Sequence, residues 1–396
     1  MEADLTSLEP SGNADAFVID TTPGSWLHQI ANRVHLSGIR LYLGAALLTY
    51  IPLMLSALIG PAHPLYPSLG IKLPFLRDFN VAFMLLVSFP ALVVFTLKDQ
   101  DFLAAALRRV QVDGVLTLSA ESAEFLASTW DRRFRLINRV AYIAGLMTGI
   151  VVVAGNYVAY VPARVGFWIA VNDHLQFCGY VFLLWIFVLY ALIPIYAIRT
   201  FGISLFLRSL VRHAEQLHML PFHPDRCGGL RPVGRLGLRN QYLLTVFALN
   251  IGTLVAVSEM YLEVPRPLYW LIAAAVVAYI ILGPLIFMGP LLSFRAGMLR
   301  TKIELMSDVA QRLRVELRRL REHLPSGSIT KEDEELIDRL RKVGAVIDEL
   351  PVWPFDAGTL RKFLTAYVVP LAGALVGGAG APTLKAFFSF LKNHIH

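Results

Sequence analysis

The sequence has 396 residues and a formal net charge of +7, with 56% hydrophobic and only 16% charged residues. This composition excludes a chain of ordinary soluble domains and predicts a membrane protein. Cys178 and Cys227 are the only cysteines, which argues against a disulfide framework.

Charge-free runs long enough to cross a bilayer recur along the chain and predict an all-α integral membrane protein with six transmembrane helices. A seventh candidate, Phe363–Leu384, is diluted by Gly and Pro and is expected either to span or to re-enter the membrane. The six runs are Leu41–Gly60, Val81–Leu97, Val140–Val161, Phe177–Ile198, Tyr242–Ser258 and Leu268–Phe294.

The basic residues predict which loops share a side of the membrane. The segments before the first run, 98–139, 199–241 and 295–362 together hold 30 Lys and Arg, whereas the three intervening loops hold 4. The positive-inside rule places the basic segments in the cytosol. The acidic start of the chain, Met1–Asp20, lacks the features of a cleaved signal peptide, so residues 1–38 are expected to form a cytosolic tail.

The predicted organisation alternates between membrane and cytosol. Pairs of transmembrane helices occupy 39–97, 140–200 and 242–294. A cytosolic helical segment, an amphipathic helix with a Gly/Arg loop, and a hairpin occupy 98–139, 201–241 and 295–351, followed by a hydrophobic segment at 352–396.

The sixth run continues without a Pro or Gly-rich break after Pro290 into a charged helix with heptad spacing. A four-residue turn, Pro325–Ser328, separates it from a second heptad helix, which predicts an antiparallel cytosolic hairpin. The apolar residues at the heptad positions of the two helices form a seam, which either only joins these two helices or also contacts a second protomer. The seam residues of the first helix are Leu299, Ile303, Met306, Ala310, Leu313, Leu317, Leu320 and Leu324, and those of the second are Leu336, Leu340, Val343, Ile347 and Leu350.

The polar stretch His213–Arg239 contains the candidate functional loop, for which metal binding is the first interpretation. His213, His218, His223 and Cys227 are of metal-ligand types, but their spacing matches no common zinc pattern, so no metal or other cofactor is expected. The tripeptide His223-Pro224-Asp225 also occurs in J-domain co-chaperones, but the surrounding residues do not resemble that domain.

Anion binding and a purely structural turn are the other interpretations of this loop. His223, Asp225, Arg226, Cys227, Gly228 and Gly229 form the loop, in which Asp225 is suited to cap a Gly-containing turn. The run lacks the Gly-Lys-Ser/Thr of a P-loop. Three arginines at four-residue spacing suit anionic lipid headgroups, although plain juxtamembrane basicity gives the same pattern. These are Arg231, Arg235 and Arg239.

Pro221–Leu230, together with Pro351–Asp356, resembles an uncharacterised family of bacterial multi-pass membrane proteins. In that family a His-Pro-Asp-x-x-Gly-Gly-Leu loop lies between hydrophobic segments and a Pro-Phe-Asp segment lies near the C-terminus. The resemblance covers these two short motifs. It implies a bacterial inner (plasma) membrane location and no particular activity.

No enzyme motif is present in the sequence, so no catalytic residue is expected. Two functions remain. One is a channel-like oligomer controlled by the hairpin, with a pathway or gate near Asn250, Glu259, Pro284 and Pro290. The other is a membrane-anchored signalling or scaffold component that binds a cytosolic protein through the hairpin and the basic loop. The lipid bilayer, anionic lipid and a homo-oligomer are the further expected partners, and nucleic acid is not one.

Overall fold

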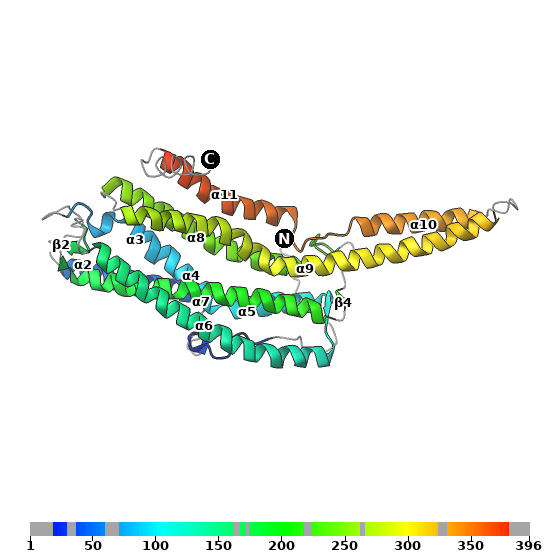
Figure 1. The fold of residues 1–396 in the computed structure, drawn as a ribbon, viewed down its shortest axis with the longest axis horizontal. Helices are drawn as coiled ribbons and strands as arrows, with labels where there is room; N and C mark the ends of the chain where they lie inside the picture. Colours follow the sequence, from blue (N-terminus) through cyan, green and yellow to red (C-terminus); the bar gives the residue numbers. More distant parts are fainter. Residues whose placement is uncertain are drawn as a thin grey trace, which may run out of the picture.

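The computed structural model describes residues 19–29, 37–59, 71–160, 167–171, 174–214, 216–217, 223–261, 266–323 and 331–379. Long, roughly parallel helices form a bundle, from one end of which a two-helix arm extends (Figure 1). We call this end of the bundle the hairpin end. The fold is all-α, as predicted.

Within the described ranges, six helices are long and apolar enough to cross a membrane, so the chain is a multi-pass membrane protein. They lie at Gly38–Ile59, Phe79–Leu97, Ala120–Val158, Phe177–His213, Arg231–Val257 and Tyr279–Arg321, and each contains or overlaps one of the predicted runs.

The helices in chain order are α2 (Gly38–Ile59), α3 (Phe79–Phe83), α4 (Phe89–Leu97), α5 (Asp99–Val112), α6 (Ala120–Tyr160), α7 (Phe177–His213), α8 (Arg231–Tyr261), α9 (Arg266–His323), α10 (Lys331–Asp348) and α11 (Ala357–Ala379). A 3-10 turn, η1 (Phe75–Arg77), precedes α3, and a π-helical turn, η2 (Met84–Ser88), joins α3 to α4. The short strands are β1 (Leu116–Thr117), β2 (Ala170–Val171), β3 (His174–Leu175) and β4 (Gln216–Leu217).

Each end of the bundle has its own set of contacts between loops. At the hairpin end, β1 pairs with β4, with Leu116 opposite Leu217. At the other end, β2 pairs with β3, and the Trp168 N–H donates to the carbonyl of Leu73 at 3.2 Å. Segments that the charge distribution assigned to one side therefore gather at the same end.

Two clusters of buried apolar residues fill the bundle. One lies among the membrane-length segments and includes Leu53, Leu85, Trp168 and Ile186. The second includes Leu107, Trp130, Phe206 and Phe294, from α5, α6, α7 and α9. Because most of the second cluster comes from segments that flank the apolar runs, with Phe294 at the end of the sixth run, the hairpin end has a packed core of its own.

Helices α6 and α7 make a close backbone contact at two glycines four residues apart. A Cβ atom on Gly145 would lie 2.5 Å from the carbonyl oxygen of Ala191, and one on Gly149 would lie 2.8 Å from the Phe187 ring. Small residues at this spacing allow membrane helices to approach closely. Gly145 and Gly149 are therefore part of the α6–α7 interface.

Helix α9 runs unbroken from Arg266 to His323 and thus passes Arg295 without interruption, as predicted from the absence of a Pro or Gly-rich break after Pro290. Pro284 lies inside it and leaves the carbonyl of Ile280, four residues earlier, without its helical donor. The hydroxyl of Tyr367 from α11 donates to that carbonyl at 2.8 Å. The backbone group freed by the proline is therefore satisfied by a neighbouring helix.

Helix α10 folds back along α9 (Figure 1). It covers only part of the predicted seam. Ile347 and Leu350 are buried, and Lys302 forms an ion pair with Asp348 at 3.3 Å. Ile303 and Leu317, in contrast, remain 59% and 50% exposed. The prediction of a hairpin is confirmed, but heptad spacing did not reveal which seam residues would face α10. Leu324 lies outside the described residues.

The seventh candidate segment begins within α11, which packs beside α8 and α9. The Phe363 ring stacks on Phe287 of α9 at a centroid distance of 4.1 Å, and Thr245 of α8 donates to the Ala366 carbonyl at 2.8 Å. The last part of Phe363–Leu384 lies outside the described residues. Whether this segment crosses the membrane stays a prediction.

Candidate functional site

The loop before α8 is folded around one carboxylate. Asp225 Oδ1 accepts hydrogen bonds from the backbone N–H groups of Cys227 at 2.8 Å and Gly229 at 3.0 Å, and Oδ2 accepts one from Arg231 at 3.2 Å. Burial opposes ionisation of Asp225, but these N–H groups and His223 outweigh it and hold the pKa of Asp225 below its usual value. Asp225 is therefore the cap of the turn, which is the structural role considered for it.

Three of the four positions from 226 to 229 in this loop have unusual backbone angles. Arg226 has φ of 55°, and Gly228 and Gly229 have φ of 65° and 89°, so all three adopt the left-handed conformation. A Cβ atom on Gly229 would overlap the side chain of Val115. The Gly-Gly pair lets the loop turn tightly against the end of α5.

Cys227 is fully buried in this turn. Burial and the charges of Asp225 and Asp356 raise the pKa of its thiol to about 12, so the thiolate that metals and electrophiles require is disfavoured. His223 instead pairs with Asp225 at 2.7 Å and lies 4.0 Å from Asp113. In the described ranges no three His, Cys, Asp or Glu side chains are grouped to hold a metal ion. His218 lies outside those ranges.

The three predicted arginines occupy one face of α8, where they line an open cavity of about 620 Å³ between α5 and the loop. The structure adds a fourth arginine, Arg109 of α5, which the sequence reasoning did not connect with the others. We call this cavity the arginine pocket. It is lined by Phe102, Ala105, Ala106, Arg109, Asp113, His223, Pro224, Asp225, Arg231, Pro232, Arg235, Leu236 and Arg239.

Two of these arginines have buried N–H groups that find no acceptor in the part of the chain that the structure describes. They are Nε of Arg231 and one terminal nitrogen of Arg239. Arg231 also lies 3.7 Å from Asp356, in the Pro-Phe-Asp segment that the sequence analysis singled out. Arg239 lies over the rings of Phe102 and Phe95, the latter at 4.6 Å. Arg226 is not among the residues that line the pocket.

The candidate pathway residues are not brought together. Gly237 packs against Phe287 of α9, so Pro284 and Pro290 lie beside the basic start of α8. Asn250 lies about 20 Å along α8 from Gly237, at a rise of about 1.5 Å per residue. Its amide donates to Asn80 of α3 at 3.4 Å. The side chain of Glu259 lies outside the described residues.

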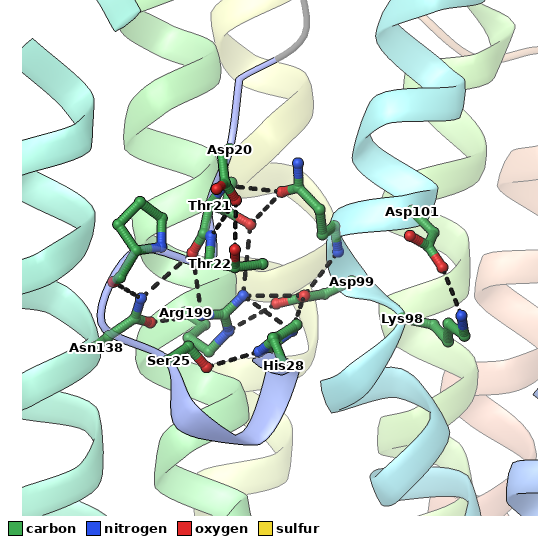
Figure 2. Close-up of polar contacts among 12 residues, drawn as sticks. Asp20, Thr21, Thr22, Ser25, His28, Lys98, Asp99, Asp101, Asn138 and Arg199 are labelled. Atoms are coloured by element: carbon green, nitrogen blue, oxygen red, sulfur yellow. Dashed lines mark hydrogen bonds and ion pairs between the residues drawn. The ribbon is translucent and has the colours of Figure 1, made fainter. Parts of the chain in front are cut away.

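A second polar site, which the sequence analysis did not predict, is centred on Arg199 of α7 (Figure 2). Arg199 is 2% exposed. Its Nε donates to Asp99 Oδ2 at 2.8 Å and a terminal nitrogen donates to Oδ1 at 3.0 Å, so the pair is bidentate. The other terminal nitrogen donates to the side chain of Asn138 on α6. We call this set the Arg199 network.

The N-terminal segment, residues 19–29, closes the Arg199 network. The carbonyl of Thr21 accepts from Arg199 at 3.2 Å, and the carbonyl of Pro23 accepts from Asn138 at 2.8 Å. Gln100 donates to the carbonyl of Ile19 at 2.6 Å. This part of the predicted tail is therefore packed into the bundle and bonded to α5, α6 and α7.

The Arg199 network contains a serine, a histidine and an aspartate in hydrogen-bonded sequence. Ser25 Oγ lies 2.7 Å from His28 Nδ1, and His28 Nε2 lies 2.8 Å from Asp99 Oδ1. A nucleophilic serine must be open to its substrate. Ser25 is fully buried, and its hydroxyl also bonds to Tyr142 at 2.7 Å. The arrangement is thus suited to hold the N-terminal segment in place and not to attack a substrate.

The charge state of Asp99 follows from its partners. Burial opposes its ionisation, but Arg199 and His28 outweigh this effect and hold the pKa of Asp99 below its usual value. Asp99 stays ionised at neutral pH, and the buried arginine is therefore neutralised.

Comparison of the chain with protein-family models, with curated proteins and with solved structures finds no match. The resemblance to a family of bacterial multi-pass membrane proteins therefore stays a prediction based on its two short motifs.

Proposed function

We propose that the protein is a non-enzymatic component of the bacterial inner membrane, with its N-terminus and the α9–α10 hairpin in the cytosol. We further propose that it acts as a membrane-anchored signalling or scaffold protein whose hairpin binds a cytosolic protein. The observation that best supports this proposal is the single helix α9, which joins a membrane-length segment to an arm with an uncovered apolar face.

The uncovered face is a stripe of apolar side chains along α9. Ile303, Ala310 and Leu317 recur every seven residues and are all exposed, while α10 packs on the neighbouring side, where Gly344 approaches Val309. We call these three residues the exposed stripe. A stripe at this spacing is the contact surface that a partner helix uses in a coiled coil.

The flanks of the exposed stripe indicate the chemistry of the partner. Arg300, Arg314 and Arg321 occupy the adjacent column of α9, also at multiples of seven residues. Opposite charges at positions flanking a coiled-coil seam favour pairing. The proposed partner therefore presents an amphipathic helix with acidic flanks. The acidic first turn of α10, with Glu332 and Glu334, makes a second copy of this chain one candidate.

A photocrosslinking amino acid placed at Ile303 or Leu317 is expected to give a protein adduct of defined mass in cells. The same replacement at Val315 is the matched control, because Val315 is 59% exposed, as is Ile303, but lies on another face of α9. The adduct mass, read by immunoblot and mass spectrometry, distinguishes a second copy from another protein. Equal adducts at all three positions, or none at 303 and 317, would contradict the proposed docking.

A channel-like oligomer is the second proposed function. It is favoured by a polar cluster within the spans, where the amide of Asn250 and the hydroxyl of Thr253 both meet Asn80, the latter at 2.9 Å. The π-helical turn η2 follows Asn80 by one turn, and such turns are frequent at functional sites.

If this cluster belongs to a pathway, the purified protein in liposomes is expected to pass ions, and Asn250→Leu is expected to lower the flux at least several-fold. Ion-sensitive dyes under cation and anion gradients provide the measurement. Gly252→Ala is the control, because a Cβ atom there would contact nothing within 4 Å. A monomeric mass in detergent together with no flux under either gradient would eliminate this function.

A further inference from the structure

We propose that the arginine pocket is a binding site for a phosphate group carried by a small molecule or a lipid headgroup, held between α5 and the first turns of α8. This site is independent of partner binding at the hairpin. Four observations carry it: the charge of the pocket lining, its unpartnered donors, its shape, and the way the nearby carboxylates are already engaged.

The lining of the pocket is positively charged. It contains four arginines and two carboxylates, which leaves a formal charge of +2 with His223 neutral. Arg109 comes from α5, and Arg231, Arg235 and Arg239 come from α8, so the positive charges face the same space from two helices. Guanidinium groups with planar, paired N–H donors are the preferred partners of phosphate oxygens.

The two carboxylates in the lining do not neutralise these arginines. Asp225 is turned toward the backbone N–H groups of its own loop and toward His223. Asp113 has His223 as its neighbour at 4.0 Å. Because both acids are directed at the loop, neither is paired with an arginine of α8 inside the pocket. Arg231 has a carboxylate partner, Asp356 at 3.7 Å, but Asp356 is not part of the pocket lining.

Unpartnered donors support the same conclusion. The buried Nε of Arg231 and a buried terminal nitrogen of Arg239 have no acceptor among the described residues. A buried polar group without a partner is unfavourable, and native proteins seldom retain one without a role. Both side chains line the pocket, so a change of rotamer would present these N–H groups to an oxygen-rich anion, which would provide acceptors, whereas an apolar or cationic ligand would not.

The dimensions of the pocket indicate the size of the ligand. A volume of about 620 Å³ lies in the range of small-molecule sites. The floor between the arginines is apolar, with Ala105, Ala106 and Leu236. A phosphate ester fits this division, because its oxygens meet the guanidinium groups and its carbon part meets the floor. The first backbone N–H of α8 is already bonded to Asp225, so the side chains must supply the binding.

The test uses the full chain in neutral detergent and two probes that separate the sources of the phosphate. Calorimetry with glycerol 3-phosphate measures binding of a soluble ester. Native mass spectrometry after incubation with phosphatidic acid, and separately with phosphatidylcholine, measures binding of a lipid headgroup. We expect at least one phosphate monoester probe to bind, and phosphatidic acid to be retained in preference to phosphatidylcholine.

The pocket variant is Arg109→Gln, Arg235→Gln, which removes two charges from exposed side chains and should leave the fold intact. We expect binding of the successful probe to weaken by roughly ten- to a hundredfold, as for lost charge-assisted hydrogen bonds. The matched control is Arg132→Gln, Arg139→Gln, which removes the same charge from exposed positions of α6.

Each result decides the proposal. Selective weakening in the pocket variant supports it, and the probe that binds identifies a soluble or a lipid source. Equal weakening in the control would show that overall basicity alone attracts the anion, and would overturn the site. The proposal would also be overturned if glycerol 3-phosphate does not bind and phosphatidic acid is retained no better than phosphatidylcholine. The hairpin crosslinks are unaffected by any of these results, so the two proposals fail separately.

Discussion

Replacing Arg199 with Met is expected to destabilise the protein by about 3–5 kcal/mol, because it removes one partner of a buried ion pair and leaves Asp99 without compensation. The guanidinium makes two hydrogen bonds to Asp99, at 2.8 and 3.0 Å, and further bonds to Asn138 and the Thr21 carbonyl. No single other side chain in the described part of the bundle joins α5, α6, α7 and the N-terminal segment in this way. Titration with SDS in mixed micelles, followed by circular dichroism, measures the loss.

The contribution of this pair also has a defined pH dependence. The pKa of Asp99 is lower in the folded protein than its usual value. Stability from the ionised carboxylate is therefore complete above the unfolded pKa of about 4 and is lost as the pH falls through the lower folded value. Arg212→Met is the control for removing an arginine from α7, since Arg212 is exposed in the last turn. A loss as small as that of the control would show that the network carries little of the stability.

The Arg199 network is the part of the structure that could not be predicted from the sequence. The six spans followed from long runs without charge, and the continuous helix α9 followed from the absence of a Pro or Gly-rich break after Pro290. Arg199 ended a charge-free run, and it was interpreted as part of the basic cytosolic side. Its partners Asp99 and Thr21 are 100 and 178 residues away along the chain. Neither periodicity nor composition can reveal a pairing at that distance.

A local signal was nevertheless present at Arg199. The apolar pattern of α7 does not stop there but continues through the buried residues Phe206, Leu207 and Leu210. A charged residue on an apolar helix face is expected to have a partner. The acidic residue that follows the second span, Asp99, was a natural candidate.

The arginine pocket was predictable in part. The four-residue spacing of Arg231, Arg235 and Arg239 fixes a common face of α8 once the helix is known to begin at Arg231. Arg109 comes from a separate segment, and only the packing of α5 against α8 brings it to the same cavity. The exposed stripe was unresolved for a related reason, since a heptad pattern defines a seam without stating which neighbour covers it.

The contact between α6 and α7 leads to the second large effect. Gly145→Ala is expected to destabilise the protein by about 1–3 kcal/mol, because the added methyl group would lie 2.5 Å from the carbonyl oxygen of Ala191 and two rigid helices would have to separate. Adding Gly149→Ala should increase the loss, since its methyl group would meet the Phe187 ring at 2.8 Å in the same interface.

Gly155→Ala on the same helix is the matched control, because a Cβ atom there would contact nothing within 4 Å. The gain in helix propensity from Gly to Ala, up to about 1 kcal/mol, is common to both sites, so the difference between the two variants isolates the interface. SDS titration of the three proteins measures this difference. Equal stabilities of Gly145→Ala and Gly155→Ala would mean that α6 and α7 do not approach closely enough for a methyl group to matter. The close packing of the two helices would then have to be abandoned.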